Sequence, residues 1–448
     1  MARILFCAKT ALHRPYWISV LTTLAGRGHE MLLTYGDGAA GLESSNEGFT
    51  IMPFPVKALS RIDHLMRETR TAISYRQRKG QSSYYFRRWA GNLPSPLSRL
   101  VMNSRSGEAL VRLRVDTLLG KLISRKPANR AVKKALQDAE PDFVLASPAN
   151  HWGSLDIECV KAARELSIPC AIVTLSWDNL STKGLFHATP DILFVWNAAH
   201  AKEAEAIHGI PPSNIVVSGA PFFEKWLAPA AQTGEAKGFL ARIGLKPGSR
   251  YVLYVGSTRR TARDESWLVR DMEDILGNSP KLRDLSLVVR PHPANVEPFR
   301  DACSDRVIVW PREGVLPSGH EDVEEFRIML ENASAVVGIN TSAMIDAVTL
   351  NVPTVAFLAD RYARTQVRAV HFKRLMNSGA VGLVDNKDAL AGMLTYVSRR
   401  RDWREEERQE FVDKYIAPHG RDYPPSAHIA DCIERRLGHP STTGVDPA

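Results

Sequence analysis

The chain has 448 residues, of which 44% are hydrophobic and 24% are charged. These are the proportions of a globular protein, and the length exceeds one ordinary core, so we expect two domains of about 200 residues each. No run of 18 uncharged apolar residues occurs, and the N-terminus lacks the apolar core of a signal peptide. The five scattered cysteines form no CxxC pair, which predicts a reducing cytoplasm and no structural zinc.

The positive charge is concentrated in one segment. Residues 57–134 hold 19 Lys or Arg and 4 Asp or Glu, a net charge of +15, whereas the whole chain carries +9. Because no nucleic-acid-binding motif is visible, we expect no nucleic-acid partner. An anionic membrane surface, an anionic substrate or simply solvated helices would each explain the charge.

The N-terminal half has the order of an α/β domain. A strand at 3–9, a helix at 16–27 and a strand at 31–35 predict a parallel sheet. Helices at 62–75 and 109–122 follow, separated by the aromatic and arginine-rich run 84–89, which either packs on its own domain or contacts a membrane or acceptor. Further expected elements are strands at 142–147, 169–175, 192–196 and 215–218, and a helix at 152–166.

The C-terminal half repeats this order after a linker at 228–234. Strands are expected at 251–255, 285–289, 307–310, 335–339 and 352–357, and helices at 321–332, 343–350, 399–415 and 426–437. The predicted domains are therefore residues 1–228, with a basic helical insert at 57–134, and residues 238–415. A C-terminal helix at 416–437 returns to the first domain, and a tail occupies 438–448.

The polar turn after the strand 335–339 is the clearest candidate for a site. Thr341 and Ser342 lie where a parallel strand meets a helix N-terminus, a position that favours phosphate because free N–H groups and the helix dipole meet the anion there. Asp346 lies one helical turn later, placed to accept hydrogen bonds from ribose hydroxyls. An ordinary capped helix with a surface Asp is the competing interpretation.

Several motifs resemble those of GT-B glycosyltransferases. The run 11–15, with His13, followed by a helix and Gly26-Arg27-Gly28-His29-Glu30, resembles their N-terminal signature. Arg290-Pro291-His292-Pro293 resembles the His-Pro motif of the GT-B families that use CMP or CDP donors: bacterial sialyltransferases, Kdo transferases and CDP-glycerol glycerophosphotransferases. Thr341-Ser342 resembles their paired hydroxyl motif, and Asp346, seven residues before Pro353, matches the glycerophosphotransferase pattern. The resemblance implies two Rossmann-like doubly wound domains facing a cleft.

The expected donor site uses loops at strand ends. A metal-independent transfer needs other groups to neutralise the leaving phosphate, and guanidinium, imidazole and helix N-terminal amides serve that purpose. The resemblance implies no cofactor and no metal, with the activated donor as a substrate. The expected donor-binding residues are Ser257, Arg259, Arg260, Arg290, His292, Thr341, Ser342 and Asp346.

The acceptor side is expected in the N-terminal domain. A general base must reach the acceptor hydroxyl, and His13, which matches the family base in position, ranks first, with Asp178 as a second catalytic candidate. His151, Trp177, Asn179 and Lys183 are suited to bind a sugar by stacking and hydrogen bonding. A structural capping role for Asp178 competes with this interpretation.

These features favour a metal-independent, inverting glycosyltransferase that extends a surface polysaccharide or glycolipid from a nucleotide-sugar. Such an enzyme is expected in the cytoplasm, peripheral on the inner membrane face through 57–134, with a glycan or lipid-linked acceptor. A CDP-glycerol-type polyol-phosphate transferase is the near alternative. A sugar-nucleotide 2-epimerase and a non-catalytic binding protein on the same fold are more distant ones.

Overall fold

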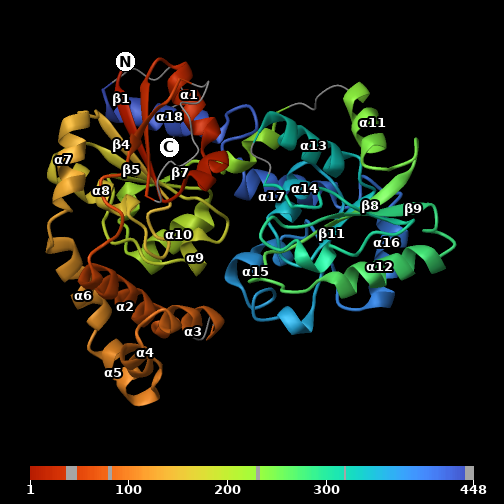
Figure 1. Ribbon diagram of the computed structural model, residues 1–448, viewed down its shortest axis with the longest axis horizontal. Coiled ribbons are helices and arrows are strands. Elements are labelled where there is room, and N and C mark those ends of the chain that lie inside the picture. Colours follow the sequence, from red (N-terminus) through yellow and green to blue (C-terminus); the bar gives the residue numbers. More distant parts are fainter. Residues whose placement is uncertain (37–47, 79–82, 229–232, 317–318, 439–448) are drawn as a thin grey trace. The chain divides into compact units, whose positions relative to one another are not determined.

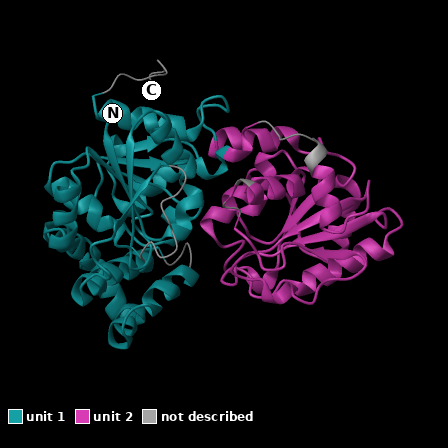
Figure 2. Cartoon of the chain, turned by 45° about the horizontal axis from the view of Figure 1, so that its top comes forward, with its two compact units in different colours: residues 1–224, 417–448 teal, residues 225–416 magenta. Residues whose placement is uncertain are grey.

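The computed structural model describes residues 1–36, 48–78, 83–228, 233–316 and 319–438. The chain forms two compact units (Figure 2): unit 1 is Met1–Glu224 with Ala417–Ala448, and unit 2 is Lys225–Ile416. The chain changes from one unit to the other after Glu224 and again after Ile416, whereas the sequence predicted domain ends at residues 228 and 415. Residues 229–232 of the expected linker and 439–448 of the expected tail lie outside the described residues.

Unit 1 is built on a parallel sheet of seven strands in the order β3-β2-β1-β4-β5-β6-β7. Figure 1 labels four of these strands, β1, β4, β5 and β7. The central strands are continuous apolar runs, because parallel sheets are covered by helices on both faces. Two buried clusters, one on each face, form the core. The strands are β1 (Arg3–Ala8), β2 (Glu30–Tyr35), β3 (Thr50–Pro53), β4 (Phe143–Ser147), β5 (Cys170–Val173), β6 (Ile192–Val195) and β7 (Ile215–Val217).

The helices of this sheet provide the crossovers that parallel strands require. The chain returns to unit 1 after Ile416, and its last helix, α18 (Pro425–Arg436), packs on α1 (Ile18–Gly26). Arg27 binds Asp431 at 2.5 Å and Glu434 at 2.7 Å across that contact. The helices are η1 (Ala11–Tyr16), α1 (Ile18–Gly26), α7 (Arg130–Ala139), α8 (Asp156–Glu165), α9 (Asn179–Thr182), α10 (Ala198–His208), η2 (Pro212–Asn214), η3 (Pro221–Trp226, which runs into unit 2) and α18 (Pro425–Arg436).

A helical insert lies between β3 and α7. Its helices are α2 (Arg61–Gln77), α3 (Ser83–Gly91), α4 (Ser95–Met102), α5 (Ser104–Arg112) and α6 (Val115–Arg125). The single helix predicted at 109–122 is wrong: Arg114, at a φ of 50°, separates α5 from α6. The hydroxyl of Tyr75 donates to the Lys183 carbonyl at 2.8 Å, and Trp89 Nε1 donates to that of Thr182 at 3.1 Å. The aromatic run therefore packs on its own unit.

Unit 2 contains a parallel sheet of six strands in the order β10-β9-β8-β11-β12-β13. This is the Rossmann order, in which strand succession reverses between the first and fourth strands, here β8 and β11. One buried cluster includes residues from β8, β9, β11 and β12. The strands are β8 (Arg250–Val255), β9 (Leu285–Arg290), β10 (Val307–Val309), β11 (Ala335–Gly338), β12 (Thr354–Phe357) and β13 (Gly382–Val384).

The long helix predicted at 399–415 begins later than expected. It starts at Glu405, after Arg404 at a φ of 54°, and buried Arg408 donates through Nε to Asn351 at 2.7 Å. Residues 399–404 instead form turns that connect it to the preceding helix. The helices of unit 2 are α11 (Thr233–Arg242), α12 (Ser266–Asn278), η4 (Glu297–Phe299), α13 (His320–Glu331), α14 (Ala343–Thr349), η5 (Asp360–Tyr362), α15 (Val370–Asn377), α16 (Lys387–Val397) and α17 (Glu405–Tyr415).

The described residues contain neither a membrane-spanning helix nor a cluster of metal ligands. None of their helices has both the length and the apolar composition needed to cross a bilayer. No group of three His, Cys, Asp or Glu side chains among them is arranged to hold a metal ion.

Candidate functional site

His13 and His151 follow the two strands between which the order of the unit 1 sheet reverses. Ligands of open parallel sheets bind at the carboxyl ends of the strands flanking such a reversal. His13 lies in η1 after β1, and His151 lies in the loop after β4. Their rings meet edge to face with centroids 5.5 Å apart. Two residues that are separated in sequence by the whole helical insert therefore form one imidazole pair.

The environment of His151 favours the neutral imidazole. Burial, with the nearby positive charge of Lys183, lowers the pKa of His151 well below its ordinary value of 6.5. Its buried Nε2 has no hydrogen-bond partner among the described residues. A neutral imidazole with an unused nitrogen is a suitable acceptor for a hydroxyl proton.

The carboxylate of Asp178 is held by neighbours within its own loop. It accepts hydrogen bonds from Ser176 Oγ at 2.7 Å, Thr182 Oγ1 at 2.6 Å and Lys183 Nζ at 2.9 Å. These three hydrogen bonds hold the carboxylate in one orientation within the loop. The geometry gives Asp178 a positioning role for Lys183, while the imidazole pair is better suited to remove a proton.

Two further residues that were predicted to bind the acceptor substrate are buried inside unit 1. Asn179 is fully buried and donates to Asn150 Oδ1 at 2.7 Å, which joins the loops after β4 and β5. Trp177 is only 7% exposed, and its carbonyl lies 3.1 Å from His200 Nε2. These contacts shape the loop that carries Asp178 and Lys183.

Sequence reasoning missed two charged groups beside the imidazole pair. Lys9 Nζ donates to the Trp152 carbonyl at 2.5 Å. Glu68, from α2 of the insert, is 6% exposed, and burial raises its pKa to about 7 despite a hydrogen bond from the Gly153 backbone. Lys9 could have been found as the last residue of the first strand segment. No local signal marks Glu68, because only folding brings α2 to this loop.

In unit 2 the loops after β8 and β11 meet through Ser257. Ser257 is buried and donates through its backbone N–H at 2.7 Å and its hydroxyl at 2.8 Å to Glu265. The same hydroxyl accepts from the Asn340 backbone at 3.3 Å. Ser257 thus joins the two loops from within, and burial raises the pKa of its partner Glu265 to about 7. Sequence reasoning did not single out Glu265.

The other polar residues of these loops are more accessible. Arg259, Arg260 and Ser342 are exposed, and Thr341 is half-buried. The loops after β8 and β9 line a cavity of about 580 Å³, whose walls include Arg259 and Asn295. The carboxyl ends of the reversing strands therefore present guanidinium and hydroxyl groups to solvent.

The loop after β9 holds His292 in a defined orientation. His292 Nδ1 accepts from the Ala294 backbone N–H at 3.0 Å, so the proton of the neutral ring is on Nε2. Burial lowers the pKa of His292 to about 4. Gly314 packs beneath this loop at a φ of +65°, where an added Cβ would lie 2.9 Å from Pro293 Cα. His292 is therefore a positioned hydrogen-bond donor at neutral pH.

Arg290 and Asp346 belong to a buried group. Arg290 lies 4.3 Å from the Phe326 ring centroid and donates to the Val315 carbonyl at 2.9 Å. Asp346 is 4% exposed and accepts from Trp226 Nε1 at 2.5 Å. Burial raises the pKa of Asp346 to about 6, against the opposing charge of Lys225. The expected ribose-binding carboxylate thus has an indole partner inside unit 2.

The comparisons identify the family. The sequence profile of the CDP-Glycerol:Poly(glycerophosphate) glycerophosphotransferase family matches residues 185–428, which is more than half of the chain and includes all of unit 2. The chain belongs to this family. It is therefore a transferase that acts on a nucleotide-activated donor, as predicted. No curated protein matches the sequence significantly.

Solved structures share the GT-B fold with this chain at low sequence identity. The S. aureus MnaA–UDP structure has a TM-score of 0.56 and 12% identity, with 100% of both chains covered. A variant of the wall teichoic acid polymerase TagF has a TM-score of 0.54 and 10% identity, covering 98% of this chain and 89% of that one. The kitacinnamycin glycotransferase has a TM-score of 0.54 and 12% identity, covering 97% and 99%. The predicted GT-B class is confirmed.

Proposed function

We propose that this transferase moves an alditol phosphate, of which glycerol phosphate is the simplest, from a CDP-activated donor to an acceptor hydroxyl. The family match over residues 185–428 carries this proposal. This match favours CDP-alditols over nucleotide-sugars as the class of donor. A structure of TagF soaked with CDPG, which has a TM-score of 0.52 to this chain, is a precedent for this donor chemistry on the same fold.

In the proposed reaction the acceptor oxygen attacks the phosphorus that carries the alditol. A new P–O bond forms, the bond to the bridging oxygen breaks, and CMP leaves with that oxygen. The hydroxyl proton passes to an imidazole of the His13–His151 pair. On the donor side, His292 Nε2–H, Arg259, Arg260 and the Thr341 and Ser342 hydroxyls supply donors to phosphate oxygens, while Arg290 and Asp346 hold the surrounding framework. No resident cofactor or metal takes part in this scheme.

We expect CMP to be the nucleotide released when the protein is incubated with CDP-glycerol and a glycan or lipid-linked acceptor. The released nucleotide and the extended acceptor are measured together by mass spectrometry, with EDTA leaving the rate unchanged. Release of UDP or GDP from the matching nucleotide-sugars would show sugar transfer instead. Conversion of a UDP-sugar to its epimer without nucleotide release would contradict both transfer schemes.

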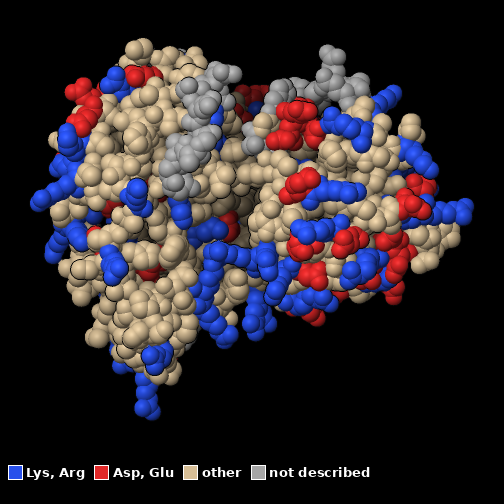
Figure 3. All heavy atoms as spheres, in the orientation of Figure 1, with Lys and Arg blue, Asp and Glu red and all other residues tan. Residues whose placement is uncertain are grey.

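A membrane-bound polymer would be a suitable acceptor for this reaction. We propose that the helical insert docks on the anionic face of the membrane. Leu113 is 73% exposed, Leu118 56% and Leu122 47%, and they alternate with Arg114, Lys121 and Arg125. On the face drawn in Figure 3, Lys and Arg side chains lie among broad uncharged areas of these helices, with few acidic ones. Exposed leucines beside cations suit the interface of a negatively charged bilayer.

We expect the protein to sediment with phosphatidylglycerol vesicles at low salt and to dissociate as ionic strength rises. The double variant Leu118→Ser/Leu122→Ser should reduce this binding at least fivefold, because it removes apolar area without changing charge. Leu383→Ser in unit 2, at a leucine 39% exposed, is the matched control and should bind as the wild type does. Equal binding of neutral and anionic vesicles would rule out the electrostatic part of the proposal.

A further inference from the structure

A cavity of about 350 Å³ lies at the amino end of the unit 2 sheet, away from the donor loops. Its walls come from the start of β8, the segment before β11 and the turn after α16. β8 is six residues long, and strands rise about 3.3 Å per residue, so this cavity is roughly 20 Å from the Ser257 loop at the other end of the strand. The lining residues are Arg250, Ala333, Ser334, Ser398, Arg399, Arg400 and Arg401.

The lining is strongly cationic. It contains four arginines and no carboxylate. Asp284, outside the lining, accepts from Arg250 Nη1 at 3.0 Å, and Arg250 Nη2 donates to the Ser398 carbonyl. Arg250 is thereby fixed in place, and the other N–H groups of its guanidinium make no hydrogen bond within the described part of the chain. The balance of charge at the cavity is positive and suits an anion.

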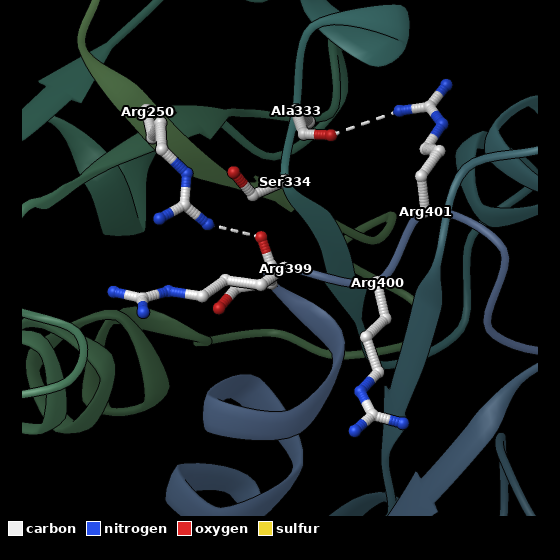
Figure 4. A pocket seen from close by; sticks show the side chains of 7 residues that line it. Arg250, Ala333, Ser334, Arg399, Arg400 and Arg401 are labelled. Carbon is white, nitrogen blue, oxygen red and sulfur yellow. Dashed lines mark hydrogen bonds between the residues drawn. The ribbon is translucent and has the colours of Figure 1, made fainter.

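The arginines have two different roles. Arg401 points away and donates to the Ala333 carbonyl at 3.2 Å (Figure 4). Arg400 donates to the Tyr396 hydroxyl at 3.0 Å. Arg399 is exposed and extends to the same side as Arg250, and the Ser334 hydroxyl points toward Arg250 in this view. Arg250, Ser334 and Arg399 therefore form the side of the cavity that a ligand would meet.

A buried hydroxyl without a partner indicates a ligand at this place. Ser398 is 6% exposed, and its Oγ makes no hydrogen bond among the described residues. Buried polar groups are nearly always hydrogen-bonded, because an unsatisfied one costs about 1–3 kcal/mol. A tetrahedral oxyanion between the guanidinium groups would accept from this hydroxyl.

We propose that this cavity binds a phosphate group, as a free phosphate monoester or as a lipid phosphate, at a site separate from the donor. Guanidinium groups of Arg250 and Arg399 pair with the phosphate oxygens, and the Ser334 and Ser398 hydroxyls add neutral donors. The cavity volume suits one phosphate with a small substituent. This site depends on neither the donor nor the acceptor assignments above.

Hydrogen exchange measured by mass spectrometry tests the site, because it reports where protection occurs. One arm uses inorganic phosphate and glycerol 3-phosphate, and the other uses phosphatidylglycerol vesicles. We expect peptides that cover residues 333–335 and 397–401 to be protected from exchange. Protection by the soluble phosphates would identify the ligand as a soluble ester, whereas protection by the vesicles alone would identify it as a lipid phosphate. Protection in neither arm would overturn the proposal.

The variants Arg399→Ala and Ser398→Ala should each lower the affinity for the ligand that gives protection by at least tenfold. Ser398→Ala should leave the melting temperature unchanged or raise it, because it removes a hydroxyl that has no partner among the residues that the structure describes. Arg270→Ala, which removes an exposed arginine on α12 of the same unit, is the matched control and should bind normally. Full affinity in Ser398→Ala and Arg399→Ala, or an equal loss in the control, would contradict the site.

Discussion

The variants His13→Ala and His151→Ala are each expected to lower turnover by about 10²–10⁴-fold while donor affinity stays within twofold of the wild type. The two rings form one pair at the reversal of the unit 1 sheet, 5.5 Å apart. Removing either imidazole takes away the proton acceptor or the ring that orients it. Single-turnover rates at saturating donor measure the chemical step, and titration calorimetry with donor measures binding.

The pH profile adds a second readout for the same pair. The unprotonated ring is the active form, so activity persists above the folded pKa and falls as pH drops through it. Because the pKa of His151 lies well below 6.5, the wild-type rate should hold at pH 6.5 and decline only in more acidic buffer. His419→Ala, at an exposed histidine of unit 1, should behave as the wild type. Full turnover in both His13→Ala and His151→Ala would remove the pair from the mechanism.

The variant His292→Ala is expected to weaken CMP and CDP-glycerol binding by about 10–100-fold, which corresponds to roughly 1.4–2.8 kcal/mol. The reason is the orientation of the ring: Nδ1 accepts from the Ala294 N–H at 3.0 Å, so Nε2–H is the donor available to a phosphate oxygen. Burial keeps the ring neutral, with a pKa of about 4, so the loss of affinity caused by His292→Ala should be the same at pH 6 and at pH 8. Titration calorimetry at these pH values measures both effects.

His292→Asn is the informative companion, since its side chain has a donor amide of similar reach. Partial recovery of affinity in that variant would support a hydrogen-bonding role over a packing role. The melting temperatures of both variants should stay close to that of the wild type, because the loop is also held by Asn295, whose amide donates to the Ser257 carbonyl at 3.1 Å. Unchanged nucleotide affinity in His292→Ala would exclude this residue from the donor site.

Much of the fold was predictable from local patterns. The runs at 3–9, 142–147, 251–255 and 335–339 are the central strands β1, β4, β8 and β11 of the two sheets. Their apolar continuity reflects burial on both faces, which is a local signal. Helix breaks were harder, because Arg114 and Arg404 adopt positive φ values without glycine or proline to mark them. The predicted helices at 109–122 and 399–415 failed at these two arginines.

The loops at the strand ends were predictable from the sequence, but the hydrogen-bond partners of their polar side chains were not. Strand-exit loops were identified from turn chemistry, and the parallel order places them at one sheet edge. Ser257 and Asn179, chosen as ligand contacts, instead join neighbouring loops through Glu265 and Asn150. Polar side chains in loops have the same composition whether they bind a ligand or another loop, so composition does not separate these roles.

The sequence by itself determined two doubly wound α/β units and the loops that end their strands, because strand and helix periodicities are set by neighbours a few residues apart. Only the tertiary structure decided which polar groups meet. His13 and His151 come together because β1 and β4 are adjacent strands. Asp346 receives its hydrogen bond from Trp226, 120 residues earlier in the chain. Such pairings depend on the packing of distant segments, which no local spacing records.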